Sequence, residues 1–502
     1  MGAARPTHDG SNDVIEDAWW QGSRHIPLSH AGERDSEGDG YRSVQFMKVL
    51  FASAEAAPVA RVGGLAEASG GLARSLRRTA VELSIVLPDY GDVALPNESS
   101  FELSVPDWAT PATVRVGEAP ELGEVHLVSV PGMARPHPYV DETGEGWPDN
   151  DQRFFAFGAA IASLAHELGA DVLHVNDWHT AAALAFSRLP SVYTIHTLGY
   201  QGAADPAWLD RLPADVAEAF RQYDAANPSA GAIRLADKIV AVSPNYAKEI
   251  LDPARGAGLH ELLADRTEDL YGIRNGIDAE LWNPSTDPVL STPYNAKTVA
   301  RKADSTAALA KQLGWPTDPT QPIIGMVTRL VEQKGIDLAL GMVPLLEGMN
   351  ARMVILGSGA QRLTLWGHQL ADEHPDRFAF VDGYKLDFAH LIFAGADLFL
   401  MPSRFEPCGL AQMQAMAYGT IPIVTAVGGL VDTVSDADRA EGGTGFVSET
   451  IDGMGMVDAT HRAIRAWGVL KRRRAIQRAG MGVDWSWTAP AGEFVELYES
   501  IT

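Results

Sequence analysis

The stretch DLFLMPSRFEPCGLAQMQAMAYGTIPIVTAVGGLVDTV, residues 397–434, contains two short apolar runs, and a polar or glycine-rich loop follows each of them. The first run ends at Pro402, and apolar residues at helical spacing follow the Glu-Pro-Cys-Gly turn. The second run ends before Gly428 and Gly429, where glycine lets backbone N–H groups approach an anion at a helix start. We therefore expect two neighbouring strands whose loops reach the carboxyl edge of one sheet, the edge where open α/β proteins bind ligands.

Similar strand-like runs recur along the chain, with helical segments between several of them. They lie at 48–52, 81–87, 125–130, 172–175, 192–195 and 239–242, and a second series begins at 322 and continues at 353–356 and 378–381. This alternation predicts an α/β fold with doubly wound parallel sheets. A chain of 502 residues is too long for one compact core, so we expect two or more domains.

The two series of strands place a first domain at 47–295 and a second at 321–475. A stretch rich in Pro, Thr and Asp separates them, and we interpret 296–320 as a linker. Residues 1–46 have no hydrophobic signal core and contain eight acidic residues, which argues against a signal or transit peptide. We expect a disordered extension there, and Met47, directly before the first apolar run, is an alternative start of the native protein.

The charge balance argues against two classes of partner. Acidic residues number 65 against 40 basic ones, a net charge of −25, which disfavours nucleic acid and anionic membranes. No run of 18 apolar residues is present that would span a membrane. The single cysteine, Cys408, excludes an intramolecular disulfide and suits a reducing compartment, so we expect a cytoplasmic protein. The sequence does not predict an oligomeric state.

Polar residues follow two of the predicted strands closely. His174, Asn176, Asp177 and His179 follow one apolar run, and His196 follows the next. No pair has the HExxH spacing of a metalloprotease, and one cysteine cannot build a thiolate site, so we predict no metal. A bare histidine is usually structural, and we favour that role for His179 more than for His196.

Two further patterns are typical of phosphate binding. Gly63 and Gly64 lie between a strand and a helical pattern, where the spacing fits a tight turn and a phosphate cradle equally well. Arg329 and Lys334 follow a strand. The planar guanidinium of arginine and the compact ammonium of lysine together suit the binding of two phosphates. The alternative is that both are solvated surface cations.

With these residues in hand, the chain resembles the bacterial glycogen synthase and plant starch synthase family, which uses a nucleotide-sugar donor. The resemblance covers roughly residues 47–500, and its motifs occur in consistent order. They are RVGGL at 61–65, WPDNDQRF at 147–154, HVNDWH at 174–179, TIHTLGYQG at 194–202, NGID at 275–278, TRLVEQKG at 328–335 and SRFEPCGL at 403–410. Each motif alone is weak, but in register they make accidental similarity very improbable.

The resemblance implies the GT-B arrangement, with two Rossmann-like domains facing across a cleft and a final helix, within 476–502, that returns to the first domain. It implies a retaining glycosyltransferase that moves glucose from ADP-glucose to the non-reducing end of an α-1,4-glucan. It implies neither a cofactor nor a metal. The partners expected are therefore the nucleotide sugar and the glucan.

The resemblance also assigns roles to single residues. Arg329 and Lys334 would hold the diphosphate, and His196 and Asp177 would contact the donor glucose. Glu406 would bind the sugar from the second domain, and attack on the same face as departure is favoured over a covalent intermediate on this carboxylate. The remaining donor-binding residues implied by the motifs are Arg61, Gly63, Gly64, Asn275, Tyr384, Cys408, Gly409, Leu410, Gly428 and Gly429, with Tyr384 stacking on the base.

Three residues depart from the family pattern. The chain has Arg61 where the family usually has Lys, Glu67 where it has Asp, and Thr197 where it has Asn. These changes lie on the first domain's side of the donor pocket and bear on donor identity and turnover. Two alternatives therefore stay open, a related GT-B transferase with another donor or a small acceptor, and a catalytically weak glucan-binding protein.

Overall fold

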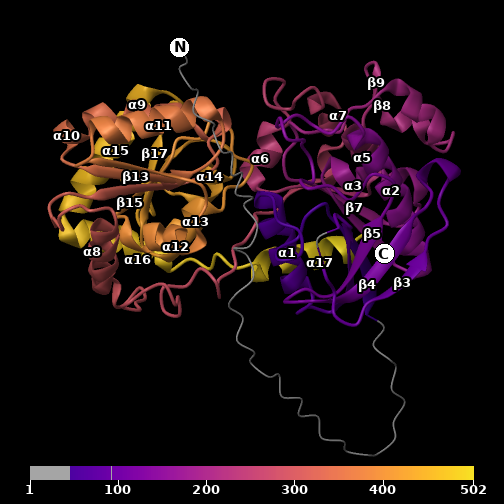
Figure 1. Ribbon diagram of the computed structural model, residues 1–502, viewed down its shortest axis with the longest axis horizontal. Helices are drawn as coiled ribbons and strands as arrows, with labels where there is room; N and C mark the ends of the chain where they lie inside the picture. The colour runs from indigo at the N-terminus through magenta and orange to yellow at the C-terminus, as the bar shows by residue number, and fades with distance from the viewer. Residues whose placement is uncertain (1–45, 92) are drawn as a thin grey trace, which may run out of the picture. The chain divides into compact units, whose positions relative to one another are not determined.

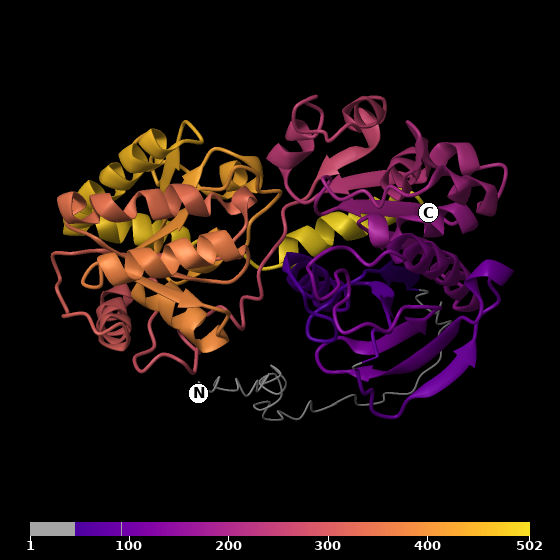
Figure 2. The same cartoon turned by 45° about the horizontal axis from the view of Figure 1, so that its top comes forward.

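The computed structural model describes residues 46–91 and 93–502. Two α/β sheets, each covered by helices, make up this part of the chain (Figures 1 and 2). The prediction of two doubly wound α/β sheets is confirmed. The extension predicted at 1–46 lies, except for residue 46, outside the described residues.

The first sheet has the strand order β11-β10-β7-β6-β1-β2-β5-β4-β3. Its strands are β1 (Met47–Ala52), β2 (Val81–Pro88), β3 (Ser99–Glu102), β4 (Thr113–Ala119), β5 (Gly123–Ser129), β6 (Val172–Asn176), β7 (Ser191–Ile195), β10 (Lys238–Ala241) and β11 (Leu270–Gly272). From β11 to β5 all neighbours pair in parallel. The short strands β8 (Arg221–Gln222) and β9 (Ala225–Ala226) form a separate hairpin.

Successive residues of the first sheet point to opposite faces, and helices cover both faces. On β1, Phe51 packs with α1 (Gly64–Leu76) and α17 (Thr488–Glu499), whereas Leu50 packs with α2 (Asn150–Glu167). Burial on both faces explains why these strands are almost continuously apolar in the sequence.

Short helices complete this half of the chain. They are α3 (Trp178–Ala181), α4 (Ala183–Phe186), α5 (Pro228–Leu235), α6 (Pro244–Glu249) and α7 (His260–Ala264). Both α5 and α6 begin with proline after a capping side chain. Asn227 accepts the N–H of Ala230, and Ser243 accepts the N–H of Tyr246, which satisfies N–H groups that the helix leaves free.

The second sheet is entirely parallel, in the order β14-β13-β12-β15-β16-β17. Its strands are β12 (Ile323–Val327), β13 (Arg352–Gly357), β14 (Phe378–Asp382), β15 (Leu398–Met401), β16 (Ile421–Thr425) and β17 (Phe446–Ser448). Its helices are α8 (Lys302–Gln312), α9 (Ile336–Gly341), α10 (Leu346–Met349), α11 (Gln361–Glu373), α12 (Leu386–Gly395), α13 (Ala411–Ala417), α14 (Gly428–Thr433), α15 (Gly453–Gly468) and α16 (Leu470–Met481). Figure 1 shows α9 and α11 on one side of this sheet and α8, α12 and α13 on the other.

The antiparallel edge of the first sheet was not predicted. Strand β4 pairs antiparallel with β5, and β3 pairs antiparallel with β4. All four residues of β3 are exposed, so no apolar pattern marks this strand in the sequence. Strands β2, β5 and β4 separate β3 from β1, so this edge is on the other side of β1 from β6 and β7, which carry Asp177 and His196 at their ends.

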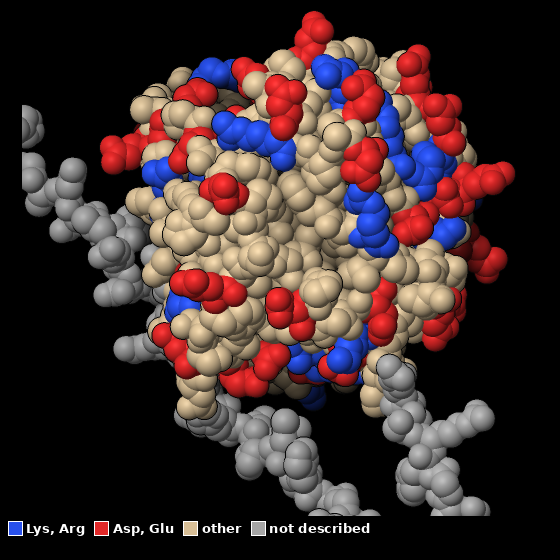
Figure 3. All heavy atoms as spheres, turned by 90° about the vertical axis from the view of Figure 1, so that its right-hand side faces the viewer, with Lys and Arg blue, Asp and Glu red and all other residues tan. Residues whose placement is uncertain are grey.

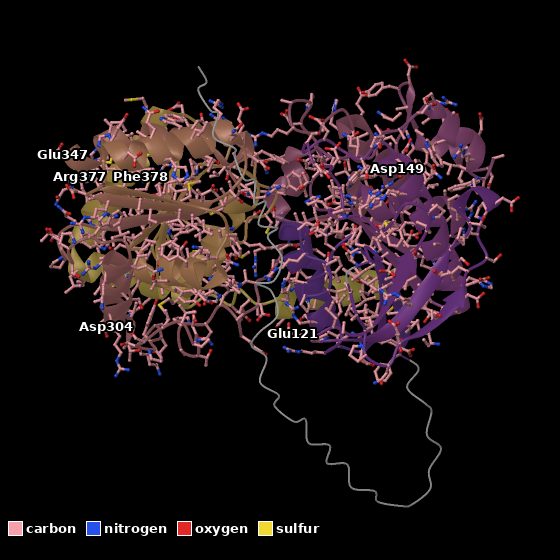
Figure 4. The ribbon with its side chains drawn as sticks, viewed as in Figure 1. Glu121, Asp149, Asp304, Glu347, Arg377 and Phe378 are labelled. Atoms are coloured by element: carbon pink, nitrogen blue, oxygen red, sulfur yellow. The ribbon has the colours of Figure 1, made fainter. Side chains whose placement is uncertain are left out.

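The segment predicted as a linker contains α8 and is firmly anchored. The buried Lys302 donates from Nζ to the carbonyl oxygen of Ala394 (2.6 Å) and to Oγ1 of Thr420 (2.6 Å). Burial lowers the pKa of Lys302 to about 7, whereas Asp304, two residues on, is exposed on the same helix (Figure 4). The polar composition that suggested a loose connection is the solvent face of a packed helix.

The chain passes between the two sheets twice, and the two crossing segments contact each other. The N–H of Ile277 in the first segment donates to the carbonyl oxygen of Trp485 in the second (2.8 Å). Beyond Trp485 the chain forms α17, which packs against α1 and whose Tyr498 hydroxyl lies 2.7 Å from Nδ1 of His174. The boundary expected at 475/476 falls inside α16.

No helix among the described residues is long and apolar enough to cross a membrane. Figure 3 shows one face of the molecule, on which acidic side chains are scattered among basic ones.

Candidate active site

Polar residues follow the carboxyl ends of parallel strands in both sheets. In the first sheet, Asp177 comes directly after β6 and His196 directly after β7. In the second sheet, Arg329 lies two residues beyond β12, and the loop that contains Glu406 follows β15. These two edges form the candidate active site.

Asp177 has a strained backbone and a buried side chain. Its backbone has φ +55° and ψ 179°, a conformation that residues other than glycine rarely adopt and that costs about 1–3 kcal/mol. Its Oδ1 accepts the backbone N–H groups of His196 (2.7 Å) and Thr197 (3.3 Å). Burial nevertheless raises the pKa of Asp177 to about 7. Strain of this kind persists where the surroundings enforce it, which is typical of functional sites.

His196 is half-buried beside Asp177. Its Nε2 lies 2.9 Å from Oδ1 of Asn176, the last residue of β6. Burial lowers the pKa of His196 to about 3, so the imidazole is neutral near pH 7. His179, by contrast, is packed against the rings of Trp178, Tyr139 and Phe154, in the structural role that we favoured for it.

The glycine loop before α1 is held by Glu55, a residue that the sequence analysis did not single out. The buried carboxylate accepts the N–H groups of Val62 (2.7 Å) and Gly63 (2.9 Å) through Oε2. Its Oε1 accepts the hydroxyl of Tyr139 (2.6 Å). The N–H of Gly63 therefore already has an acceptor. An acidic residue between a strand and a glycine loop was the available signal.

Neither the backbone conformation nor the packing of the protein requires glycine at positions 63 and 64. Gly63 has φ −157°, an ordinary extended value, and Gly64 is not among the glycines with positive φ. A Cβ added at either position would meet no atom within 4 Å. The missing side chains therefore leave open space in front of α1, as a closely approaching ligand requires.

Two of the three departures from the family pattern contact each other. The Nε of Arg61 donates to Oε1 of Glu67 (2.7 Å), and both side chains are partly exposed. Tyr384, on the second sheet's side, is exposed, and burial of part of its ring raises the pKa of the phenol. The positive charge of Arg61 lowers this pKa and the negative charge of Glu67 raises it.

Lys334 and Glu406 form a close ion pair at the second edge. The Lys334 Nζ lies 2.5 Å from Oε2 of Glu406, which also accepts the hydroxyl of Ser403 (3.1 Å). The backbone around them is braced by hydrogen bonds, because Gln333 donates to the carbonyl oxygen of Phe405 (3.0 Å). The structure thus brings together two residues that are 72 positions apart in the sequence.

Arg329 lies at the same edge with its guanidinium exposed. Within residues 46–91 and 93–502, no hydrogen bond or ion pair joins this side chain to the protein. A planar fork of donors without a protein acceptor is suited to bind a phosphate.

The amides of Gly428 and Gly429 were predicted to be available to a phosphate, but both N–H groups have acceptors within the protein. The N–H of Gly428 donates to Oε1 of Glu249 (2.9 Å), and the N–H of Gly429 donates to the carbonyl oxygen of Glu406 (3.1 Å). Gly428 has φ +44°, and an added Cβ would lie 1.8 Å from the Glu406 carbonyl oxygen. At Gly429 it would lie 2.4 Å from the carbonyl oxygen of Cys408. These glycines are required because the Glu406 loop packs directly on them.

The remaining predicted residues line the base of this loop. Cys408 and Asn275 are both buried, and burial raises the pKa of the Cys408 thiol to about 12. Gly409 has φ +75°, which favours glycine, and the half-buried Leu410 precedes α13. The Cys408 side chain therefore contributes packing here rather than an exposed contact.

Two acidic residues join the two edges in a reciprocal contact that was not foreseen. Glu249 of α6 accepts the N–H of Gly428 at the start of α14, and Asp432 of α14 accepts the N–H of Asn245 at the start of α6 (2.8 Å). Each helix thus caps the other. The contact joins residues more than 170 positions apart, so no local sequence pattern marks it.

No group of three or more His, Cys, Asp or Glu side chains in the described part of the chain is placed to hold a metal ion. The absence of a metal from the reaction stays a prediction.

Two family models match the chain in the order of its sheets. The model described as "Starch synthase catalytic domain" matches residues 48–265, and "Glycosyl transferases group 1" matches residues 310–480. Together with two α/β sheets whose parallel strands carry polar loops at their carboxyl ends, these matches define a GT-B glycosyltransferase. The predicted fold class and enzyme class are confirmed.

Relatives of known type cover almost the whole chain. Glycogen synthase 2 of Nitrosococcus oceani is 38% identical over 477 residues, which cover 90% of this chain and 97% of the relative. Glycogen synthase of Halorhodospira halophila is 38% identical over 473 residues, covering 91% and 99%. The structure of the catalytic domain of starch synthase IV from Arabidopsis thaliana bound to ADP and acarbose has a TM-score of 0.81 at 31% identity, covering 91% and 99%. The chain belongs to the glycogen synthase family.

Proposed function

We propose that the chain transfers glucose from ADP-glucose to the non-reducing end of an α-1,4-glucan, with retention of configuration. The observation that carries the proposal is the 2.5 Å contact between Lys334 and Glu406 at the second sheet's edge, in a member of the glycogen synthase family. A cation for a diphosphate and a carboxylate for sugar hydroxyls lie side by side there. The starch synthase structure bound to ADP and acarbose supports the same pair of ligands.

The leaving diphosphate sets the main electrostatic demand of the reaction. Negative charge grows on the phosphate as the bond between the anomeric carbon and the diphosphate oxygen breaks, and fixed cations stabilise that charge. We assign this role to the exposed guanidinium of Arg329 and the ammonium of Lys334. The open space at Gly63 and Gly64, in front of the 13-residue helix α1, supports placing the phosphates near its positive end.

The amides of Gly428 and Gly429 are not part of the proposed phosphate site. Their N–H groups have acceptors within the protein, and the loop on which Glu406 lies fills the space beside them. We assign them the role of holding Glu406 and Cys408 in place.

Retention by attack on the departing face is favoured over a covalent intermediate. A double displacement needs a free carboxylate nucleophile opposite the leaving group. Glu406 is engaged by Lys334 and Ser403, and Asp177 is engaged by two backbone N–H groups. Both carboxylates are thus better suited to hold sugar hydroxyls or to stabilise positive charge than to attack carbon.

A matrix of donors and acceptors tests the proposal. Purified protein is incubated with ADP-, UDP- or GDP-glucose, each with and without glycogen, and glucose incorporation is measured. Incorporation from ADP-glucose that depends on glycogen is expected. Transfer from another donor only, or transfer that does not need a glucan, would overturn the proposal in favour of a related GT-B transferase.

Substitution at Lys334 separates an enzyme from a glucan-binding protein without turnover. Lys334→Ala should reduce turnover by roughly 100-fold or more while glycogen binding in a sedimentation assay is retained. Lys297→Ala, at an exposed lysine outside the site, is the matched control. Equal turnover in both variants would contradict the assigned role of Lys334. A cytoplasmic location remains a prediction from composition.

A further inference from the structure

The side chain of Asn176 contacts both the backbone of β1 and the ring of His196. Its side chain has no solvent exposure, and it lies at the end of β6 beside β1. The amide nitrogen Nδ2 donates to the carbonyl oxygen of Ala52 (3.0 Å), and Oδ1 lies 2.9 Å from Nε2 of His196. The backbone N–H of Asn176 is bonded separately, to Oγ1 of Thr180 (2.7 Å).

The orientation of this amide follows from its partners. The carbonyl oxygen of Ala52 can only accept a hydrogen bond, so the NH₂ group of Asn176 must face it. The amide oxygen then faces His196. Because an amide oxygen can only accept as well, the Nε2 of His196 must be the donor in this contact.

The imidazole has a single N–H to place. Burial lowers the pKa of His196 to about 3, so the ring is neutral near pH 7. The titratable groups that interact with it are Asp177, which accepts its backbone N–H, and His174 and His179, whose pKa values burial also lowers to about 3. A neutral ring that is protonated at Nε2 has a bare lone pair at Nδ1.

We propose that Asn176 is a positioning residue that holds His196 in the Nε2–H tautomer, so that Nδ1 accepts a hydrogen bond from a hydroxyl of the bound sugar. No described residue bonds Nδ1 of His196, and this atom is not among the buried atoms that lack a partner. The identity of the sugar rests on the proposed function, whereas the tautomer rests only on the contacts of Asn176.

The tautomer determines what the site can bind. A lone pair at Nδ1 accepts from a hydroxyl and disfavours a group that offers only acceptors, such as a carboxylate or a C–F bond. The opposite tautomer would offer a donor and reverse this preference. Asn176 therefore selects the hydrogen-bonding character of a group that faces the sugar, without touching the sugar.

Nitrogen NMR of the full-length protein with ¹⁵N-labelled histidine tests the proposal directly. The ring signals of His196 are assigned by their loss in His196→Gln. Protonated Nε2 and unprotonated Nδ1 are expected from pH 6 to pH 8. A protonated Nδ1, or an average of the two tautomers, in the unsubstituted protein would overturn the inference.

Two variants, one at the end of β6 and one in α3, test the role of Asn176 itself. Asn176→Leu should remove the fixed tautomer and reduce kcat/KM for the donor roughly tenfold, the effect of one hydrogen bond. Thr180→Val removes the neighbouring buried hydrogen bond but leaves the Nε2 contact, so it should retain the tautomer. An unchanged tautomer in a folded Asn176→Leu variant would contradict the proposal, and the NMR of the unsubstituted protein decides the matter if that variant fails to fold.

The outcomes separate this inference from the proposed function. A protonated Nε2 without any transfer from ADP-glucose would remove the proposed function and leave the positioning role. Transfer from ADP-glucose with a protonated Nδ1 would remove the positioning role and leave the function.

Discussion

The two glycine pairs of this protein occupy comparable places, since each pair lies at the start of a helix on a sheet's carboxyl edge. At Gly63 and Gly64 an added Cβ would meet no atom within 4 Å. At Gly428 and Gly429 it would lie 1.8 Å and 2.4 Å from the backbone oxygens of the Glu406 loop. The same sequence signal thus has two physical causes, an open space at the first edge and close packing at the second.

The difference extends to the energy stored at each edge. The first edge contains Asp177, which combines a strained backbone with a buried carboxylate, whereas the second edge is closed by hydrogen bonds within the chain. We therefore expect substitutions at the first edge to increase stability at the expense of turnover. Substitutions at the second edge should reduce stability, and turnover should fall with it.

The largest effect is expected for Gly428→Ala. The added methyl group meets the backbone oxygen of Glu406, and φ +44° is unfavourable for alanine, so the loop must move. The free energy of unfolding should fall by about 3 kcal/mol, and activity should be lost because Glu406 is displaced from Lys334. Urea unfolding and glucose incorporation measure the two effects. Unchanged stability would remove the distinction between the edges.

Asp177→Asn is expected to show the next largest effect, in the opposite direction. A raised pKa in the folded state means that Asp177 favours folding below its unfolded pKa, near 4, and that this contribution is lost as the pH rises through about 7. The neutral variant avoids the loss. Its stability relative to the unsubstituted protein should therefore increase by about 2 kcal/mol between pH 5 and pH 7. Urea unfolding at each pH measures this difference, and a pH-independent difference would be inconsistent with a buried carboxylate.

Glu249→Gln tests the contact that closes the second edge. The substitution retains an acceptor for the N–H of Gly428 but removes the negative charge and the ion pair with Arg255 (3.1 Å). Stability should fall by about 1 kcal/mol, the difference between a charged and a neutral hydrogen bond. Glu261→Gln, at an exposed residue of α7, provides the matched comparison. Equal denaturation midpoints for the two variants would show that the reciprocal capping contributes nothing.

The smallest stability change, and the sharpest contrast, is expected for Gly64→Ala. Alanine fits the backbone of α1 and should increase stability by about 0.5 kcal/mol. The methyl group occupies the space assigned to the donor, so the KM for ADP-glucose should rise roughly tenfold. Steady-state kinetics beside thermal unfolding would detect both. A variant with unaltered KM would mean that the open space is not used by the donor.

Much of this architecture was predictable because parallel strands are buried on both faces. The apolar runs and the polar residues that end them located Asp177, His196, Arg329 and Glu406 at the sheet edges. Their roles in binding and catalysis stay predictions.

The sequence did not predict that the N–H groups of Gly428 and Gly429 are hydrogen-bonded within the protein. Glu249 and Gly428 are 179 positions apart, and the sequence between them gives no sign that one would cap the other. The exposed strand β3 lacked any apolar pattern, and the polar face of α8 resembled a linker. In each case the deciding interaction was a tertiary contact or an exposed surface, which local patterns do not record.

The position of α17 has a consequence for how the chain is made. Phe494 and Tyr498 complete the core beneath the first sheet, and Tyr498 is bonded to His174. Residues 488–499 leave the ribosome after every strand of both sheets, although the sheet that they cover begins at residue 47. The second sheet and its helices up to α16 are therefore complete first during synthesis, and the core of the first sheet is finished only after α17 has emerged. A prematurely terminated chain would expose the unfinished core of the first sheet, which marks it for degradation.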